Sequence, residues 1–232
     1  MIDTSTPKGR IADAALALAA ERPWRDVTLR DIAERTGLGL AGLREHAATK
    51  GEVIALIARA IDDQVVENAP RPVAGEGKRD ALFEVIMARF DALTPYKAAV
   101  RSIIADASTE PAAIRAMLTS QGWMLQAAGI DSGGLDGGVR VAGMTSVYAS
   151  VLRTWLDDDD PGLARTMAAL DRRLRRGERT LALFDDVAGT LRRIGEGVAS
   201  IVGGASRPRS KPDPAPDSSE AAKPAPDMPI NA

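Results

Sequence analysis

Apolar residues recur at every third or fourth position through most of the chain, a spacing that is typical of amphipathic helices. Between residues 9 and 22 the apolar stripe consists of Ile11, Ala14, Ala15 and Leu18. Similar stripes follow as far as residue 174. Aromatic residues are few and alanines many, which agrees with closely packed helices. The pattern therefore predicts an all-α protein.

The pattern changes between residues 27 and 50, where two short helices are expected on either side of a glycine. The sequence there is VTLRDIAERTGLGLAGLREHAATK. Thr28 and Asp31 have the spacing of a reciprocal N-terminal cap, which predicts a helix over residues 28–35. Gly37 ends this helix, and a second one is expected from Leu40 to His46. Such a pair forms a helix-turn-helix, whose second helix can enter the major groove of DNA.

Several residues around this unit match one known family in order and spacing. They are Ile11, Ala14, Ala15 and Leu18, then Thr28-Leu29-Arg30-Asp31-Ile32-Ala33, Gly37-Leu38, Leu43, His46 and Lys50. With them the chain resembles the TetR family of bacterial transcriptional regulators. The resemblance implies a TetR-like fold, with a three-helix DNA-binding head at residues 7–49 and a C-terminal helical bundle. The residues it places toward DNA are Thr28, Arg30, Leu40, Arg44, His46 and Lys50.

The predicted recognition helix is unusually apolar. Bases are read by donors and acceptors such as Arg, Lys, Asn and Gln, and residues 39–43 read GLAGL. Arg44 stands where the family usually has a Tyr, and Ala47 where it has an aromatic residue. From Lys8 to Lys50 there are eight basic and six acidic residues, which leaves a net charge of only +2. Arg44 is thus the strongest base-reading candidate, and the head has a weak electrostatic footprint for DNA.

The rest of the chain divides at changes of composition. Residues 1–6 are expected to be a loose arm, and residues 50–67 a connecting helix with Ile54, Ile57, Ile61 and Val65 as its stripe. Residues 68–77, rich in Pro and Gly, are predicted to be a linker. A ligand-binding and dimerisation domain is expected over residues 78–202. Residues 203–232 are rich in Pro, Ser and Ala and are expected to be disordered.

Helices are predicted in this second domain at 96–106, 111–128 and 139–157, within a bundle of about six. Residues 129–138, with five glycines, are expected to form a loop, and Asp160 to cap a further helix. Bulky residues of the bundle are either simple core or the lining of a pocket for an apolar molecule or lipid. They are Phe90, Met117, Trp123, Met124, Met144, Tyr148 and Trp155.

Two apolar helices suggest an assembly. Residues 139–157 are nearly continuously apolar, and residues 184–201 repeat apolar positions at alternating spacings of three and four. The segment from Phe184 to Ile201 could pack on the bundle, pair with a second subunit, or lie in a membrane surface. We expect a homodimer in which both helices form a symmetric interface.

A second set of residues in the C-terminal half points to another family. It comprises Val141-Ala142-Gly143, Tyr148, Leu152, Trp155-Leu156-Asp157, Thr166-Met167 and Leu170-Asp171-Arg172-Arg173-Leu174. These residues are similar to the lipid-binding accessory proteins of ubiquinone biosynthesis, which share the TetR-like fold. The resemblance implies an apolar lipid pocket, a membrane-touching C-terminal helix and a head that no longer reads DNA.

Composition excludes several kinds of chemistry. The chain of 232 residues contains no cysteine and a single histidine, which rules out thiolate metal sites and most zinc or histidine-based catalytic sites. Neither a signal peptide nor a membrane-spanning apolar run is evident. We therefore expect a cytoplasmic protein without catalytic residues, cofactor or metal. Two functions remain open: a TetR-like regulator with an apolar effector, or a lipid- or isoprenoid-binding accessory protein.

Overall fold

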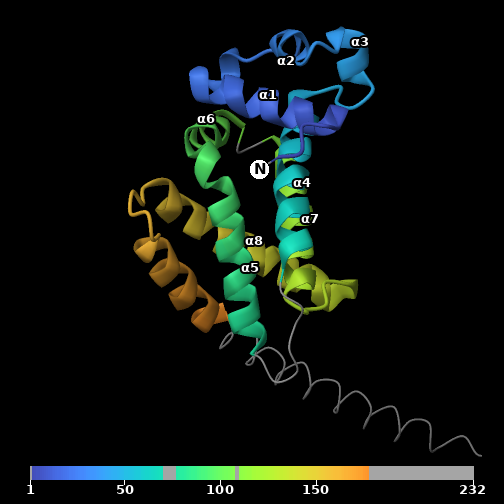
Figure 1. Ribbon diagram of the computed structural model, residues 1–232. Helices are drawn as coiled ribbons and strands as arrows, with labels where there is room; N and C mark the ends of the chain where they lie inside the picture. Colours follow the sequence, from blue (N-terminus) through green and yellow to red (C-terminus); the bar gives the residue numbers. More distant parts are fainter. Residues whose placement is uncertain (1, 70–76, 108–109, 178–232) are drawn as a thin grey trace, which may run out of the picture. The chain divides into compact units, whose positions relative to one another are not determined.

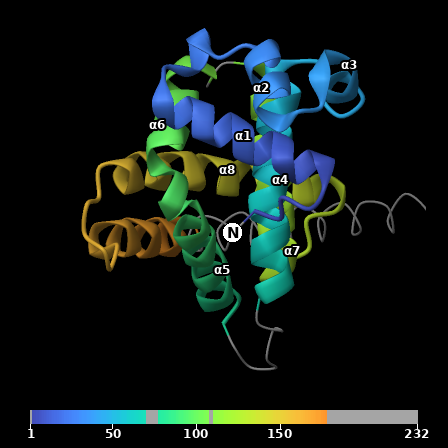
Figure 2. The ribbon, with the colours of Figure 1, turned by 45° about the horizontal axis from the view of Figure 1, so that its top comes forward.

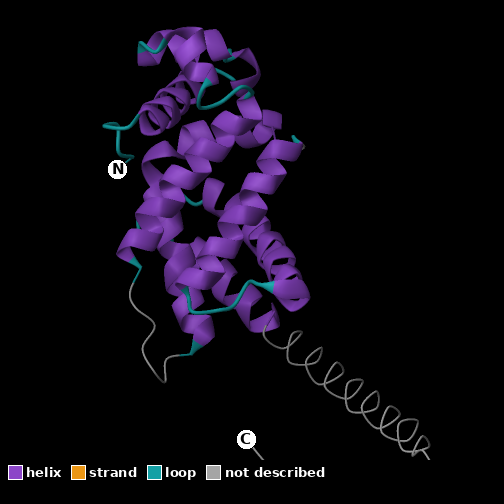
Figure 3. Ribbon diagram, turned by 90° about the vertical axis from the view of Figure 1, so that its right-hand side faces the viewer, coloured by secondary structure: helices purple, strands orange, loops and turns teal. Residues whose placement is uncertain are grey.

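Every regular element that the structure describes is a helix (Figures 1 and 3). The computed structural model describes residues 2–69, 77–107 and 110–177. The first helices are α1 (Pro7–Glu21), α2 (Leu29–Thr36), α3 (Gly39–Arg44) and α4 (Lys50–Asn68). They are followed by α5 (Lys78–Leu93), α6 (Lys97–Ala107), α7 (Pro111–Ala127), α8 (Gly134–Leu156) and a helical stretch at residues 164–177. The predicted all-α class is confirmed.

Local capping signals set many of the helix ends. Thr6 accepts a hydrogen bond from the Gly9 amide at 3.0 Å and Pro7 follows in the first turn, where its missing N–H costs nothing. The predicted reciprocal cap of Thr28 and Asp31 is present. Asp160 accepts from the Ala164 amide at 3.0 Å, which confirms it as a cap.

The turn of the helix-turn-helix depends on glycine. Gly37 ends α2 with a φ of 69°, and Gly39 opens α3 with a φ of 66°. Side chains with a Cβ are disfavoured in this left-handed region, so the two glycines permit the sharp change of direction. The second helix begins at Gly39 and ends at Arg44, one or two residues earlier at each end than the sequence predicts.

We call residues 7–49 the head and the described residues from 78 to 177 the body. In the head, α1 crosses α4 and α6 and packs against both (Figure 2). Its buried face is made largely of alanine and leucine, and Ile11, Ala12, Ala15 and Leu16 are almost fully excluded from water. Small side chains let helices approach closely, so α1 ties the head to the body.

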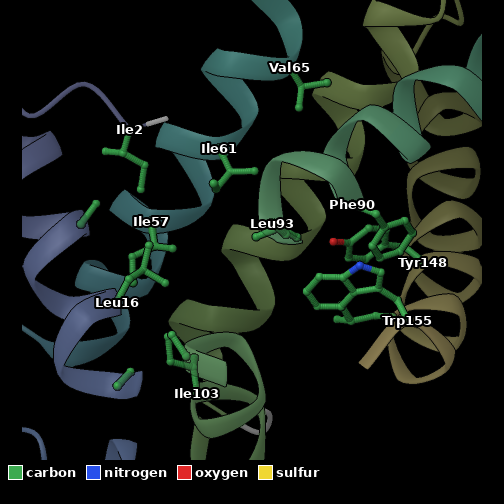
Figure 4. Packing of buried hydrophobic residues seen from close by; sticks show 14 of the residues in the cluster. Ile2, Leu16, Ile57, Ile61, Val65, Phe90, Leu93, Ile103, Tyr148 and Trp155 are labelled. Carbon is green, nitrogen blue, oxygen red and sulfur yellow. The ribbon is translucent and has the colours of Figure 1, made fainter. Parts of the chain in front are cut away.

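The connecting helix α4 leaves the head and packs along α7 of the body (Figure 1). A Cβ added at Gly51 would lie 2.5 Å from the Cβ of Ala112, so glycine permits this close approach. Farther into the body, the Phe90 ring stacks on Tyr148 and Trp155, with centroids 5.2 and 5.6 Å apart (Figure 4).

Two sequence-based expectations are wrong at the level of local structure. The arm at residues 1–6 is not loose, because Ile2 is 5% exposed and belongs to the hydrophobic core (Figure 4). The loop expected at residues 129–138 ends early, because α8 already begins at Gly134. At the arm, burial of Ile2 outweighs the polar composition of its neighbours. At α8, continuation into a long apolar helix outweighs the glycine-rich composition of the first turn.

Some predicted elements lie outside the described residues. These are most of the predicted linker (residues 70–76), the Phe184 to Ile201 helix, the tail at residues 203–232, and any bundle helix beyond residue 177. No helix in the described ranges is long and apolar enough to cross a bilayer. All of the described residues belong to one compact unit, so the head and the body can be analysed together.

Candidate nucleic-acid interface and ligand cavity

The outer face of α3 carries one strongly polar side chain. Leu40 is 44% exposed, and Ala41 and Arg44 are exposed as well. Leu43 and Ala47 are buried and hold the helix against the rest of the head. Ala47 is therefore a small residue of the core. Arg44 is left as the side chain of α3 that could donate to a base or a phosphate.

Three of the seven basic residues of the head, Arg22, Arg25 and Arg35, have acidic partners. Arg22 lies 2.8 Å from Asp31, and Arg35 lies 2.8 Å from Glu21. By contrast, Arg30 and Arg44 are exposed and make no ion pair with any described residue. The structure therefore leaves two cations of the helix-turn-helix available to a polyanion.

Lys50 lies in a different environment from the two arginines. Its ammonium donates to the Trp24 carbonyl oxygen at 2.5 Å and lies 4.7 Å from the centroid of the Trp24 ring. Partial burial lowers the pKa of Lys50, against the opposing effect of Glu110 and Asp106. Lys50 therefore fastens the start of α4 to the turn after α1, rather than projecting freely into solvent.

Thr28 and His46 occupy helix-end positions. Thr28 is exposed and is engaged as the cap of α2. Its hydrogen bonds hold the pKa of the Asp31 carboxyl below its usual value, with a smaller effect from Arg22. His46 is partly buried just after α3, and its amide donates to the Leu43 carbonyl at 3.0 Å. Both residues lie in the helix-turn-helix, beside the exposed arginines in sequence.

The head is bonded to the body through the short 3-10 turn η1 (Trp24–Asp26). The Trp24 amide donates to the Ser102 hydroxyl at 2.8 Å, and the Arg25 amide donates to the Asp106 carboxylate at 2.8 Å. Ser102 and Asp106 both belong to α6. A shift of α6 would therefore pull on the turn that precedes the helix-turn-helix.

The body contains a cavity of about 440 Å³ between α4, α5, α6, α7 and α8. Its wall is mainly aliphatic, and α4 contributes Ile54, Ile57 and Ile61. From α6 come Val100, Ile103, Ile104 and Ala107, on the same helix that holds the head. A volume of this size suits a small apolar ligand.

Only part of the predicted pocket lines this cavity. Met117 and Tyr148 are on its wall. Phe90 and Trp155 stack beside Tyr148 in the core, and Met124 is fully buried. Met144 is buried away from the cavity wall, and Trp123 is 50% exposed on α7. The structure thus separates the seven bulky residues into lining, core and surface.

A buried polar cluster meets the cavity at Arg89. The Arg89 Nε donates to Asp62 at 2.8 Å, its Nη1 donates to the Tyr148 hydroxyl, and the Ser120 hydroxyl donates to Asp62 at 2.9 Å. Burial opposes the charge of Arg89, but Tyr148 and Asp62 together raise its pKa, so it stays protonated. Burial raises the pKa of Tyr148, against Arg89, so the phenol stays neutral.

The sequence analysis did not identify the buried pair Arg89 and Asp62, or Arg153, which together with Arg89 lines the cavity. For Arg89 and Asp62 the sequence does contain a signal. Leu82, Val85, Ile86 and Leu93 mark the buried face of α5, and Arg89 occupies the vacant place in that stripe. A charged residue on an apolar face is rarely fully buried unless it is paired. Its partner Asp62 stands similarly between Ile61 and Val65.

The described residues thus form a helix-turn-helix head that a connecting helix joins to a helical bundle with an apolar cavity. The chain matches no protein-family model and no curated protein. It is similar to the TetR transcriptional regulator from Nitrosomonas europaea ATCC 19718, with 22% identity over 74% of this chain and 97% of that one, and a TM-score of 0.58. A TetR transcriptional regulator from Rhodococcus sp. RHA1 gives 20% identity, 72% and 92% coverage, and a TM-score of 0.56. The chain therefore has the TetR-like fold that its N-terminal motifs predict.

Proposed function

We propose that the protein is a TetR-type transcriptional regulator that acts in the cytoplasm and binds operator DNA through its head. The observation that carries the proposal is that Arg30 and Arg44, on an intact helix-turn-helix, are exposed and have no ion-pair partner among the described residues. Positive side chains that meet phosphates release counterions and supply much of the affinity for DNA. Thr28 and His46 lie in the same unit, and Lys50 fixes its position.

The effector site in this proposal is the cavity of the body. Both α4 and α6 line the cavity, and both also touch the head, α4 through Lys50 and α6 through Ser102 and Asp106. A ligand that binds one arrangement of these helices better than another shifts the population toward it. Occupation of the cavity would thereby change the position of the head and its affinity for DNA.

A homodimer belongs to the same proposal, because two heads read two half-sites. Leu135 and Val139 on α8 are 92% and 63% exposed, and Trp123 on α7 is 50% exposed. Leu135 and Val139 are four residues apart and so share one face of α8, and a contiguous exposed apolar patch marks a protein contact. Light scattering of the full chain at micromolar concentration is expected to give a dimer. A monomer there would contradict this part of the proposal.

The second candidate function is an accessory protein that binds a lipid or isoprenoid and has lost DNA recognition. The observation that favours it is the outer face of α3, where Leu40 and Ala41 offer no hydrogen-bond donors to bases. In this account the apolar cavity holds the lipid, and the Phe184 to Ile201 segment touches the membrane.

A gel shift against the DNA upstream of the protein's own gene separates the two functions. At about 50 mM salt, the regulator is expected to bind saturably and to resist excess nonspecific DNA. The Arg30→Ala, Arg44→Ala double variant should lose that binding, whereas Arg115→Ala, an exposed arginine of α7, should retain it. Absence of any shift at low salt supports the lipid-binding account.

A further inference from the structure

The charge on the cavity wall has one sign. The lining residues include two arginines, Arg89 and Arg153, and no aspartate or glutamate. The other polar side chains are Thr145 and Tyr148, and the rest are apolar. Folding therefore brings two cations to one apolar cavity.

The two arginines differ in how their charge is balanced. Arg89 is 6% exposed, and Asp62 lies 2.8 Å from its Nε, so its charge is already compensated. A ligand at Arg89 would find a hydrogen-bonding group with little net charge. Arg89 and Tyr148 therefore favour a polar contact, but they do not require an anion.

Arg153 is exposed and makes no hydrogen bond or ion pair with any described residue. It also lines the cavity, so it stands where the cavity meets solvent. The hydroxyl proton of Thr145 is already used, because it is donated to the Val141 carbonyl oxygen at 2.7 Å. The uncompensated charge of the cavity is therefore that of Arg153, at its mouth.

The shape of the wall suits a chain. Along α8 the lining runs from Thr145 to Leu156, a span of twelve residues, or about 16 Å at the rise of a helix. The isoleucines of α4 and α6 also line the cavity. An acidic head group at the mouth would stay hydrated and avoid the cost of burying a charge, while the chain leaves water.

We propose that the cavity takes an amphipathic acid with a single apolar chain, whose head group pairs with Arg153. The proposal rests on the proposed function in one respect, since both place the effector in this cavity. Each methylene that the cavity buries strengthens binding about fourfold. The ligand is recognised by its apolar length and by one negative charge at the end.

Isothermal titration of the full chain without DNA tests the proposal. The probes are decanoate and decyltrimethylammonium, each below the concentration at which it forms micelles, and decanol below its solubility limit. Decanoate is expected to bind one molecule per chain, and the cation to bind worst. Arg153→Gln should weaken decanoate binding about fivefold, as for an exposed ion pair, and leave decanol binding within about twofold.

Matched variants separate a pairing role from general electrostatics and from misfolding. Arg115→Gln removes an exposed arginine of α7 that does not line the cavity and should leave decanoate binding unchanged. Arg153→Lys keeps the charge and should retain the preference for decanoate over decanol. Equal weakening of decanoate and decanol by Arg153→Gln, or equal binding of the acid and the cation, overturns the proposal.

The outcomes distinguish this proposal from the proposed function. Selective decanoate binding by a protein that gives no gel shift removes the regulator and keeps the acid-binding cavity. A specific gel shift together with nonselective binding of all three chains keeps the regulator and overturns the role of Arg153. Failure of all three chains to bind overturns the acid-binding cavity, while the gel shift decides DNA binding separately.

Discussion

Arg30 and Arg44 of the head and Arg89 of the body have opposite surroundings. In the head, Arg30 and Arg44 are exposed and unpaired among the described residues, whereas in the body Arg89 is buried against Asp62. An exposed arginine adds little to stability and is available to a phosphate. A buried arginine compensates the charge of its partner, so its removal strongly lowers the stability of the fold. The comparison shows that burial, not residue type, separates a binding cation from a structural one.

The two regions also pack differently. The head places alanines such as Ala12, Ala15 and Ala33 between its helices, and its helices approach closely. The body relies on large rings, with Phe90, Tyr148 and Trp155 stacked together, and leaves an apolar cavity nearby.

The largest effect is expected from Arg89→Met in the body. The change leaves Asp62 buried without its cation, which should lower the free energy of unfolding by about 3–5 kcal/mol. Urea denaturation measures this loss. Because the neutral side chain of Asn costs less to bury than a carboxylate, the Arg89→Met, Asp62→Asn double variant should recover part of the stability. A loss below about 1 kcal/mol for the single variant would show that the pair is not buried in solution.

Arg44→Ala in the head is expected to act on DNA binding alone. An exposed substitution of this kind shifts stability by less than about 0.5 kcal/mol. Loss of a bidentate contact to guanine would cost about 1–3 kcal/mol and relax specificity at one base pair. Loss of a phosphate contact would weaken all sequences alike and lower the salt slope by about one. Gel shifts at several salt concentrations distinguish the two contacts.

Leu40→Lys is the complementary variant on the same helix. Leu40 is 44% exposed, so a lysine there is accommodated without loss of core packing. If the outer face of α3 meets DNA, nonspecific affinity should rise and the salt slope should steepen by about 0.9. Unchanged binding by both Leu40→Lys and Arg44→Ala would mean that α3 does not face DNA.

A smaller effect is expected where the connecting helix passes the body. A Cβ at Gly51 would lie 2.5 Å from that of Ala112, so Gly51→Ala should push α4 away from α7. The cost of overpacking is expected to exceed the gain in helix propensity. Thermal unfolding should therefore show a net destabilisation of about 1–2 kcal/mol. The matched control is Gly143→Ala on α8, whose Cβ meets nothing within 4 Å. It should be neutral or stabilise by up to about 1 kcal/mol.

The smallest effect is a pH dependence in the head. Hydrogen bonds from Thr28 lower the pKa of Asp31 below 3.8, its ordinary value. A lowered carboxyl pKa gives stability that is present above the ordinary value and is lost as the pH falls through the folded-state value. Unfolding followed from pH 5 to pH 3 should therefore show a steeper loss for the wild type than for Asp31→Asn. Parallel curves would mean that the cap does not persist in solution.

Several features of the head could be predicted from the sequence because they depend on neighbours along the chain. The cap of Thr28 on Asp31 spans three residues, and the left-handed turn at Gly37 needs only a residue without a Cβ. Ile11 and Leu18 likewise lie on one face of α1 by helical spacing alone. Such short-range signals also indicated the TetR-like fold, which the solved structures support.

The functional surfaces were predicted only in part. The sequence analysis placed Arg30, Arg44 and Lys50 toward DNA. Arg30 and Arg44 are exposed, but the Lys50 ammonium donates a hydrogen bond to the carbonyl oxygen of Trp24, 26 residues earlier in the chain. In the body, Met117 and Tyr148 line the cavity, but the pattern grouped them with the core residues Phe90 and Trp155. Periodicity tells which face of a helix is buried, but not whether that face meets a neighbour or a void.

By itself the sequence determined the helices, their caps and the helix-turn-helix, because hydrogen bonds and spacing within a few residues fix them. The tertiary structure alone decided where charge and empty space lie. Arg89 meets Asp62 and Tyr148 only when α5, α4 and α8 come together, and the cavity exists only between five helices. Burial and voids depend on side chains that are distant along the chain, so no local pattern specifies them.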